Sequence, residues 1–169
     1  MLTKLIAINA ASWLVLQLSI AWGVTLLNSN LFASDNLLYR LREWETGFYR
    51  RWLSIRRWKR LLPDGGPWVG SSFRKKRMAS RDFTYLRQFT IETRRSEMAH
   101  WLMLACAPLF CLWNPPRAWA VTALYAIAAN VPCIVVQRYN RDAIGGVLAR
   151  RDRLSPFGRS DAVATAVGE

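Results

Sequence analysis

The sequence is poor in the residues that build most metal centres and disulfide frameworks. It contains one histidine, His100, and three cysteines among 169 residues. The cysteines are odd in number and fall within or near apolar segments, which argues against a disulfide framework, and their spacing matches no zinc site. Glu97-x-x-His100 matches one half of a di-iron carboxylate motif, but no second histidine is present to complete it. We therefore expect no bound metal and no resident cofactor.

Acidic residues are also scarce. There are 11 Asp and Glu against 24 Lys and Arg, which gives a net charge of +13, while apolar residues reach 52%. So large a charge on so apolar a chain indicates contact with either nucleic acid or anionic lipid headgroups. No helix-turn-helix, RNP or zinc-finger pattern is present. The sequence therefore predicts a membrane protein that binds no nucleic acid, and it indicates no oligomeric state.

Long uncharged runs are abundant instead. Residues 5–27 and 118–136 are each long enough to cross a hydrocarbon core of about 30 Å. Residues 101–113 are too short to cross alone, so they would either re-enter or cross by continuing the helix that carries His100. We expect spans at about 5–27, 100–113 and 118–136. The first run could instead be a cleaved signal peptide, although the basic stretch that follows it resists export.

The distribution of bases predicts the topology. Residues 28–99 carry 16 Lys and Arg against seven acids, and six Arg follow the third run. Only Lys4 precedes the first run and only Arg117 lies between the second and the third. The positive-inside rule then puts the N-terminus outside the cell and both the loop 28–99 and the C-terminus in the cytoplasm.

These observations predict an all-α, multi-pass protein of the cell membrane. We expect one integral membrane domain over residues 1–149, with two to three transmembrane helices and cytoplasmic amphipathic interfacial helices. A disordered polar tail is expected over residues 150–169, because that segment is rich in Arg, Gly, Ala and Ser.

Two helices are expected in the basic loop. Residues 37–62 place an apolar side chain at every third or fourth position with Arg in the gaps, which is typical of a helix lying in the membrane interface. An ordinary surface helix that faces a core has the same pattern. A proline-glycine turn through Asp64 ends this helix. A second helix is expected from Ser80 or Arg81 to His100, with Ser80 as its N-cap.

The candidate catalytic residues gather where this second helix meets the apolar run. Glu97 and His100 are three residues apart and share a helix face, and Glu92 lies about two turns from His100. A carboxylate beside an imidazole fixes its tautomer and raises its basicity, as in many acyl-transfer sites. His100 would be the general base, oriented by Glu97 or Glu92. The same side chains could instead simply solvate the helix end at the membrane boundary.

Two further residues could stabilise an oxyanion. Arg95 lies on the same helix, and Asn130 lies in the third apolar run, where a polar side chain is costly unless it is hydrogen-bonded. Asn130 could equally satisfy the carbonyl that Pro132 leaves without a donor.

Candidate substrate-binding residues lie on the cytoplasmic side. The run from Arg74 through Lys75 and Lys76 to Arg77, and the pair Arg56-Arg57, suit the phosphates of a donor such as coenzyme A, or equally those of lipid headgroups. Five hydrogen-bonding side chains follow the third run on the side of His100: Gln137, Arg138, Tyr139, Asn140 and Arg141.

Four sequence elements carry a resemblance to a known family. They are Leu62-Pro63-Asp64-Gly65, Glu92-Thr93-x-Arg95-x-Glu97-x-x-His100-Trp101, Trp113-Asn114-Pro115, and Asn130-x-Pro132-Cys133-Ile134-x-x-Gln137-Arg138-Tyr139-Asn140-Arg141. Together, over about residues 43–141, they resemble the glycosyl-4,4'-diaponeurosporenoate acyltransferases, small membrane enzymes of staphyloxanthin-type carotenoid synthesis.

The resemblance implies an activity class. A fatty acyl group would move from acyl-CoA or a similar cosubstrate onto a hydroxyl of a glycosylated lipid or glycosyl carotenoid, and Asp64 joins the substrate-binding candidates. The alternative is a non-catalytic membrane scaffold that binds anionic lipid or a biosynthetic enzyme, for which the bases and aromatic residues would suffice.

Overall fold

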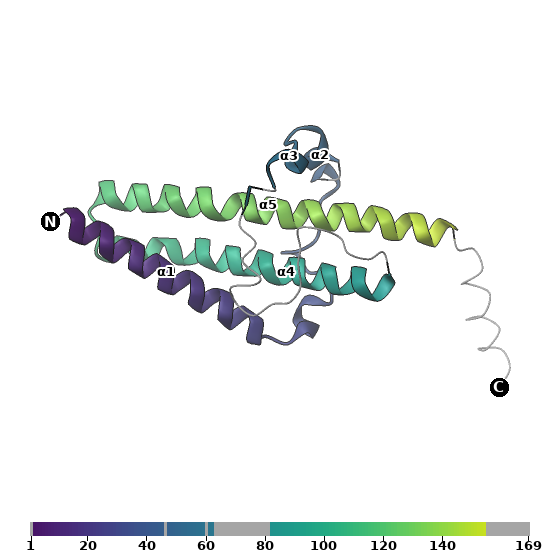
Figure 1. Ribbon diagram of the computed structural model, residues 1–169, viewed down its shortest axis with the longest axis horizontal. Coiled ribbons are helices and arrows are strands. Elements are labelled where there is room, and N and C mark those ends of the chain that lie inside the picture. The colour runs from purple at the N-terminus through teal and green to yellow at the C-terminus, as the bar shows by residue number, and fades with distance from the viewer. Residues whose placement is uncertain (1, 46, 60, 63–81, 155–169) are drawn as a thin grey trace.

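Three long helices lie side by side in the computed structural model (Figure 1). They are α1 (Leu2–Leu26), α4 (Phe83–Cys106) and α5 (Pro116–Leu154), and α4 packs against both of the others. The structure describes residues 2–45, 47–59, 61–62 and 82–154, and within these ranges no strand is formed. The all-helical class predicted from the sequence is confirmed.

Two of the helices, α1 and α5, are long and apolar enough to cross a membrane. Only 6% of the most apolar window of α1 and 22% of that of α5 is buried inside the protein. Core helices of a soluble protein would be mostly buried. The exposed side chains are large and apolar on both helices, including Leu14, Leu18 and Trp22 on α1 and Leu124 and Ile127 on α5. Lipid is the medium that suits such faces, and the chain associates with the membrane.

The second apolar run continues the helix that carries His100. Helix α4 runs through His100 to Cys106, and the 3-10 helix η4 (Ala107–Leu112), with Pro108 in its first turn, extends it. Residues 100–112 therefore cover roughly 22 Å at the rises of the two helix types. Trp13 of α1 stacks on Phe110 at 4.5 Å, so this segment lies along the N-terminal half of α1. Of the two alternatives left open by the sequence, the structure has the continued helix.

Asn9 and Asn114 hydrogen-bond each other at the end of the bundle where α1 begins. Asn9 on α1 donates to the side-chain oxygen of Asn114 at 2.7 Å, and Asn114 donates back to Asn9 at 2.9 Å. The indole of Trp113 also donates to Asn9 at 2.9 Å. Because the bonds satisfy both amides in an apolar setting, they fix α1 against the turn between η4 and α5.

The single amphipathic helix predicted over 37–62 is wrong. The segment instead holds three short elements: η2 (Glu43–Glu45), α2 (Phe48–Arg51) and α3 (Ile55–Trp58), after the earlier 3-10 helix η1 (Ser29–Phe32). Gly47 and Ser54 have left-handed backbone angles, with φ of 80° and 45°, and each precedes one of the short α-helices. The apolar stripe is also divided, since Ile55 is buried beside Val136 of α5 while Trp52 is exposed.

Two other boundaries differ from the predictions. Helix α4 begins after Asp82, whose side chain accepts a hydrogen bond from the backbone N–H of Thr84 at 3.1 Å, so the N-cap is Asp82 rather than Ser80. Helix α5 continues to Leu154, so residues 150–154, assigned to the tail, are helical. Asp64, the basic run 74–77, Ser80 and residues 155–169 lie outside the described residues.

Candidate active site

The ring of His100 hydrogen-bonds an amide on α5. His100 is half-buried on α4, and its Nδ1 lies 2.9 Å from Oδ1 of Asn130 on α5, a residue with 1% of its surface exposed. The Nδ2 of Asn130 donates to the carbonyl of Ala126 at 2.9 Å, which requires the amide oxygen to face the ring. An amide oxygen only accepts, so Nδ1 carries the proton and, in the neutral ring, Nε2 is the basic nitrogen.

Asn130 therefore contacts the imidazole at the position where Glu97 or Glu92 was expected. One of the two roles weighed for Asn130 does not match its contacts, because its nitrogen bonds the carbonyl of Ala126, whereas the carbonyl four residues before Pro132 is that of Ala128. That bond uses one of the two N–H groups of the amide, so the oxyanion role stays a prediction.

Glu97 instead joins α4 to α5. It is fully buried, and its Oε1 accepts from Nη1 of Arg138 at 2.7 Å and from the indole of Trp101 at 3.2 Å. Its Oε2 accepts from Nη2 of Arg141. Both oxygens are thus engaged by groups other than the imidazole. Glu92 is similarly engaged, by Arg95 at 2.9 Å and by Gln88 at 3.3 Å.

Arg138 uses all five of its N–H groups inside the protein. Nε and Nη2 donate to the two oxygens of Glu45, at 2.7 and 2.9 Å, and Nη1 donates to Glu97. The remaining two bonds go to the backbone carbonyls of Leu38 and Arg40, at 3.0 and 3.1 Å. A guanidinium has five donors, so Arg138 is fully occupied by the fold. Arg138 was predicted to bind substrate, but it has no N–H group left to donate to one.

Two arginines on α4 hold the segment after α1. Arg94 donates to the carbonyls of Phe32 and Ala33, at 2.8 and 2.9 Å, and pairs with Asp35. Arg95 donates to the carbonyl of Leu27 at 3.3 Å and to the hydroxyl of Ser29 at 3.0 Å, and its guanidinium lies over the ring of Phe32. Arg95 was predicted to stabilise an oxyanion, but these contacts engage it in the fold.

Arg138 and Arg141 explain why one helix does not run through residues 38–40. The carbonyls of Leu38 and Arg40 accept from Arg138, and the carbonyl of Tyr39 accepts from Arg141 at 3.4 Å. A buried guanidinium needs acceptors, and backbone carbonyls turned toward it serve that need. The chain is thereby drawn across the α4–α5 pair in an irregular path instead of a helix.

The other four residues of the set 137–141 face the α2–α3 segment or the interior. Lys59 lies over the ring of Tyr139 at 5.2 Å and donates to Oδ1 of Asn140 at 3.4 Å. Gln137 is buried, and its Oε1 has no hydrogen-bond partner. Arg141 is also buried, and its Nε and Nη1 are without partners. Of the set 137–141, Gln137 and Arg141 have buried polar atoms without a hydrogen-bond partner.

Electrostatics favour ionised Glu45. Burial alone would raise the pKa of the Glu45 carboxyl, but hydrogen bonds from Arg138, from the Arg42 backbone and from the Tyr49 hydroxyl outweigh burial and lower the pKa to about 2. Burial, and then the hydrogen bond to Glu45, raise the pKa of Tyr49. Glu45 is therefore ionised at neutral pH and pairs with Arg138 as a charged group.

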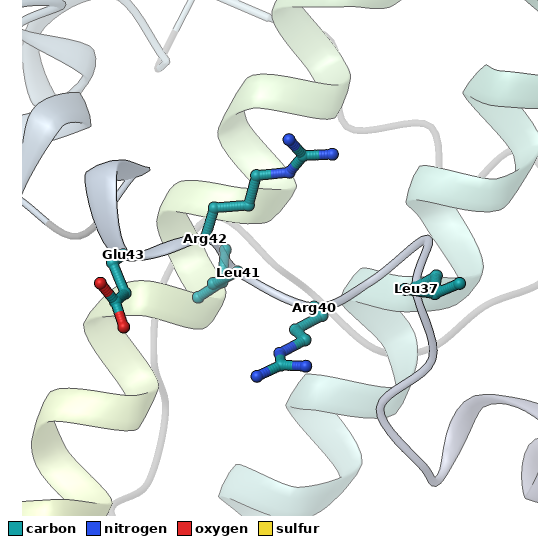
Figure 2. A pocket seen from close by; sticks show the side chains of 5 residues that line it. All are labelled: Leu37, Arg40, Leu41, Arg42 and Glu43. Atoms are coloured by element: carbon teal, nitrogen blue, oxygen red, sulfur yellow. The ribbon is translucent and has the colours of Figure 1, made fainter.

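A shallow, open pocket of about 330 Å³ lies on the outer side of this segment. Figure 2 shows the five side chains that line it, on the stretch that crosses between α4 and α5. Arg40 and Arg42 point in different directions there, so they form no converging anion site. The lining residues are Leu37, Arg40, Leu41, Arg42 and Glu43. In the described part of the chain, no three His, Cys, Asp or Glu side chains gather as a metal site.

Sequence reasoning missed Glu45, Tyr39 and the Asn9–Asn114 pair. Glu45 lies inside the segment predicted as the helix 37–62, and no local pattern indicated that this acid would be buried. Asn9 is a polar residue in an uncharged apolar run, and such a residue indicates a hydrogen-bond partner elsewhere in the fold. Its partner lies 105 residues away, and only the fold brings the two together.

Comparison with known proteins agrees with the sequence elements described above. The sequence model of the glycosyl-4,4'-diaponeurosporenoate acyltransferase family matches residues 35–150. Similar proteins include the glycosyl-4,4'-diaponeurosporenoate acyltransferases of Staphylococcus aureus strains MRSA252 and USA300. Each is 29% identical over 139 residues, which cover 80% of this chain and 83% of the relative. No solved structure matches this chain. The chain belongs to the glycosyl-4,4'-diaponeurosporenoate acyltransferase family and is an acyltransferase.

Proposed function

We propose that this enzyme transfers a fatty acyl group onto a hydroxyl of a glycosylated lipid or glycosyl carotenoid, with His100 as the general base. The observation that carries the proposal is the hydrogen bond between His100 and Asn130, which selects Nε2 as the basic nitrogen. The family supports acyl transfer, and the relatives' names support a glycosyl diaponeurosporenoate acceptor. Family membership also favours an enzyme over the non-catalytic scaffold.

The proposed reaction needs one proton carrier. Nε2 of His100 takes the proton from the acceptor hydroxyl while that oxygen attacks the carbonyl carbon of the acyl donor. The bond from the carbonyl to the leaving group then breaks, and the imidazolium returns the proton to the departing thiolate if the donor is acyl-CoA or a similar thioester. The products are an ester and a free thiol, and Asn130 keeps the ring in one tautomer throughout.

The position of His100 along the helix bundle suits a reaction between one apolar and one polar substrate. Met98 and Ala99, just before His100, pack against the buried cluster that includes Val24, as does Ile20, and both α1 residues lie in the last two turns of that helix. From Ile20 to the end of α1 is about 9 Å at the helical rise. His100 thus lies beside the end of an apolar helix, at a depth where an acyl chain and a sugar could meet.

Sidedness and the donor site are part of the proposal. The bases of 28–99 and of the C-terminal segment support a cytoplasmic position for that end of the bundle, against an anionic leaflet. Donor phosphates would bind the basic run Arg74 to Arg77, including Lys75 and Lys76, and Asp64 is a further candidate for substrate binding. Gln137 and Arg141 are the remaining candidates for polar substrate contacts, because both retain unsatisfied hydrogen-bonding atoms.

The test is a single substitution in reconstituted protein. His100→Ala, in nanodiscs supplied with acyl-CoA and a glycosyl lipid, should lower product formation by about 10²-fold or more, measured by mass spectrometry. Cys106→Ala, on the same helix and half-buried, is the matched control and should retain activity. A His100→Ala protein that inserts, folds and makes product at the normal rate would remove the base assignment.

A further inference from the structure

The helices α2 and α3 form an arm on one side of the bundle. They lie on the face of α5 opposite α4 and α1 (Figure 1). Tyr49 and Ile55 attach the arm through a buried cluster with Val136 and Tyr139 of α5. The indole of Trp58 donates to the carbonyl of Leu53 at 2.8 Å, which closes the turn between the two helices. The arm is therefore folded and packed against α5, and it is not an extended loop.

The arm stands at the level where α1 ends. Its anchors on α5, Val136 and Tyr139, lie six and nine residues beyond Asn130, or roughly 9 to 14 Å toward the C-terminus. Asn130 is opposite His100, which lies beside the last two turns of α1. The position along α5 and the position along α1 both bring the arm to the level of Leu26, where α1 ends. The arm thus projects sideways, along the plane of a membrane that α1 and α5 would cross.

The surface of the arm combines exposed apolar groups with bases and no acid. Trp52 is 69% exposed, Leu53 is 39% exposed, and Arg51 lies over the Trp52 ring at 5.9 Å. Arg56 and Arg57 are exposed on α3. Residues 48–59 contain five Lys and Arg and no Asp or Glu. Indole rings and bases at one level are the composition that partitions to the headgroup layer of an anionic leaflet.

We propose that the α2–α3 arm docks onto anionic phospholipid headgroups through Trp52, Leu53, Arg56 and Arg57. The arm holds α5 laterally at the membrane surface and sets the depth of the helix that carries Asn130. The sequence pattern predicted that every apolar side chain along one face of a helix over 37–62 would contact the membrane interface. The structure assigns half of that stripe to packing on α5 and leaves a smaller, more basic surface for lipid.

The docking can be measured without any assay of activity. A fluorescent label is attached at Leu53→Cys, in a chain whose three native cysteines are Ala, in nanodiscs of phosphatidylcholine alone or mixed with phosphatidylglycerol. Quenching by lipids that carry a nitroxide near the headgroup reports the depth of the label. Leu18→Cys in the apolar window of α1 calibrates deep burial, and Gly146→Cys on α5, where an added side chain meets no atom within 4 Å, calibrates the aqueous end.

We expect the label at position 53 to be quenched at least about twofold more in the anionic nanodiscs than the label at position 146. Arg56→Gln with Arg57→Gln should abolish this excess. The matched pair Arg87→Gln with Arg150→Gln removes the same charge from exposed positions outside the arm and should leave the excess unchanged. Equal thermal unfolding of the two double variants establishes that both are folded.

Three outcomes would overturn the proposal. The label at position 53 could be quenched no more than the label at position 146 in either lipid mixture. The matched control pair could remove the excess as fully as the arm pair does, which would indicate net charge rather than the arm. Free coenzyme A could displace the label from the anionic surface and bind the arm equally well in phosphatidylcholine nanodiscs, which would make the arm a donor site. None of these readouts depends on catalysis by His100.

Discussion

Glu97 on α4 accepts a hydrogen bond from Arg138 on α5 across 2.7 Å, and this contact sets how the two helices meet. Arg138 reaches Glu97 from one side while Glu45 binds it from the other, so the carboxylates clamp one guanidinium. His100 follows Glu97 by three residues and therefore shares its face. The clamp thus turns the face of α4 that carries His100 toward Asn130. Glu97 acts on the candidate site by position and not by contact with the ring.

Replacing Glu97 should affect stability more than chemistry. Glu97→Gln leaves Arg141 buried with a neutral partner, and breaking a buried ion pair costs about 3–5 kcal/mol. We expect a marked fall in thermal stability in detergent, with the activity per folded molecule reduced far less than in His100→Ala. Glu43→Gln, exposed and two residues from Glu45, is the control. A stable Glu97→Gln protein with no activity would favour a direct catalytic role.

The network should weaken in acid. The pKa of Glu45 is lowered to about 2 in the folded protein from an ordinary value of 4.5. Its contribution to folding is therefore present above about pH 4.5 and is lost as pH falls toward 2, with a size on the order of 2 kcal/mol. The difference in unfolding free energy between wild type and Glu45→Gln should shrink between pH 7 and pH 3, measured by circular dichroism. A difference independent of pH over that range would contradict the ionised network.

Asn130 should act through His100. Asn130→Ala removes the acceptor for Nδ1, so the ring can rotate and adopt the other tautomer. We expect kcat to fall by roughly 10- to 100-fold with little change in KM, measured with the same nanodisc assay. Cys133→Ala, one turn along α5, is the control and should retain activity. Normal kcat in a folded Asn130→Ala protein would mean that the ring needs no orienting partner.

The Asn9–Asn114 pair should couple α1 to the turn before α5. A double-mutant cycle of Asn9→Ala and Asn114→Ala should give a coupling of about 0.5–1.5 kcal/mol in unfolding free energy. The Thr122 hydroxyl donates to the carbonyl of Ala118 in its own helix, so the cycle of Asn9→Ala with Thr122→Ala should give no coupling. Equal coupling in both cycles would mean that the amide pair is not specific.

Part of this architecture follows from local sequence. The uncharged run predicted at 5–27 lies in α1 except for its last residue, and the run 118–136 lies within α5. The length and polarity of a run suffice to indicate a helix that suits lipid. The prediction from local spacing was wrong over 37–62. An apolar residue at every third or fourth position indicates a helix only if the backbone carbonyls bond N–H groups of the same segment. There, Arg138 and Arg141 take the backbone carbonyls of residues 38–40.

The sequence by itself determined the membrane helices, the family and the residues from which the site is drawn. Only the tertiary structure decided the role of each. Glu97 and His100 are neighbours in sequence, yet Glu97 pairs with arginines 41 and 44 residues away while His100 bonds an asparagine 30 residues away. The reason is physical: a buried carboxylate needs charged donors on more than one side, and in a helix bundle the second helix supplies them.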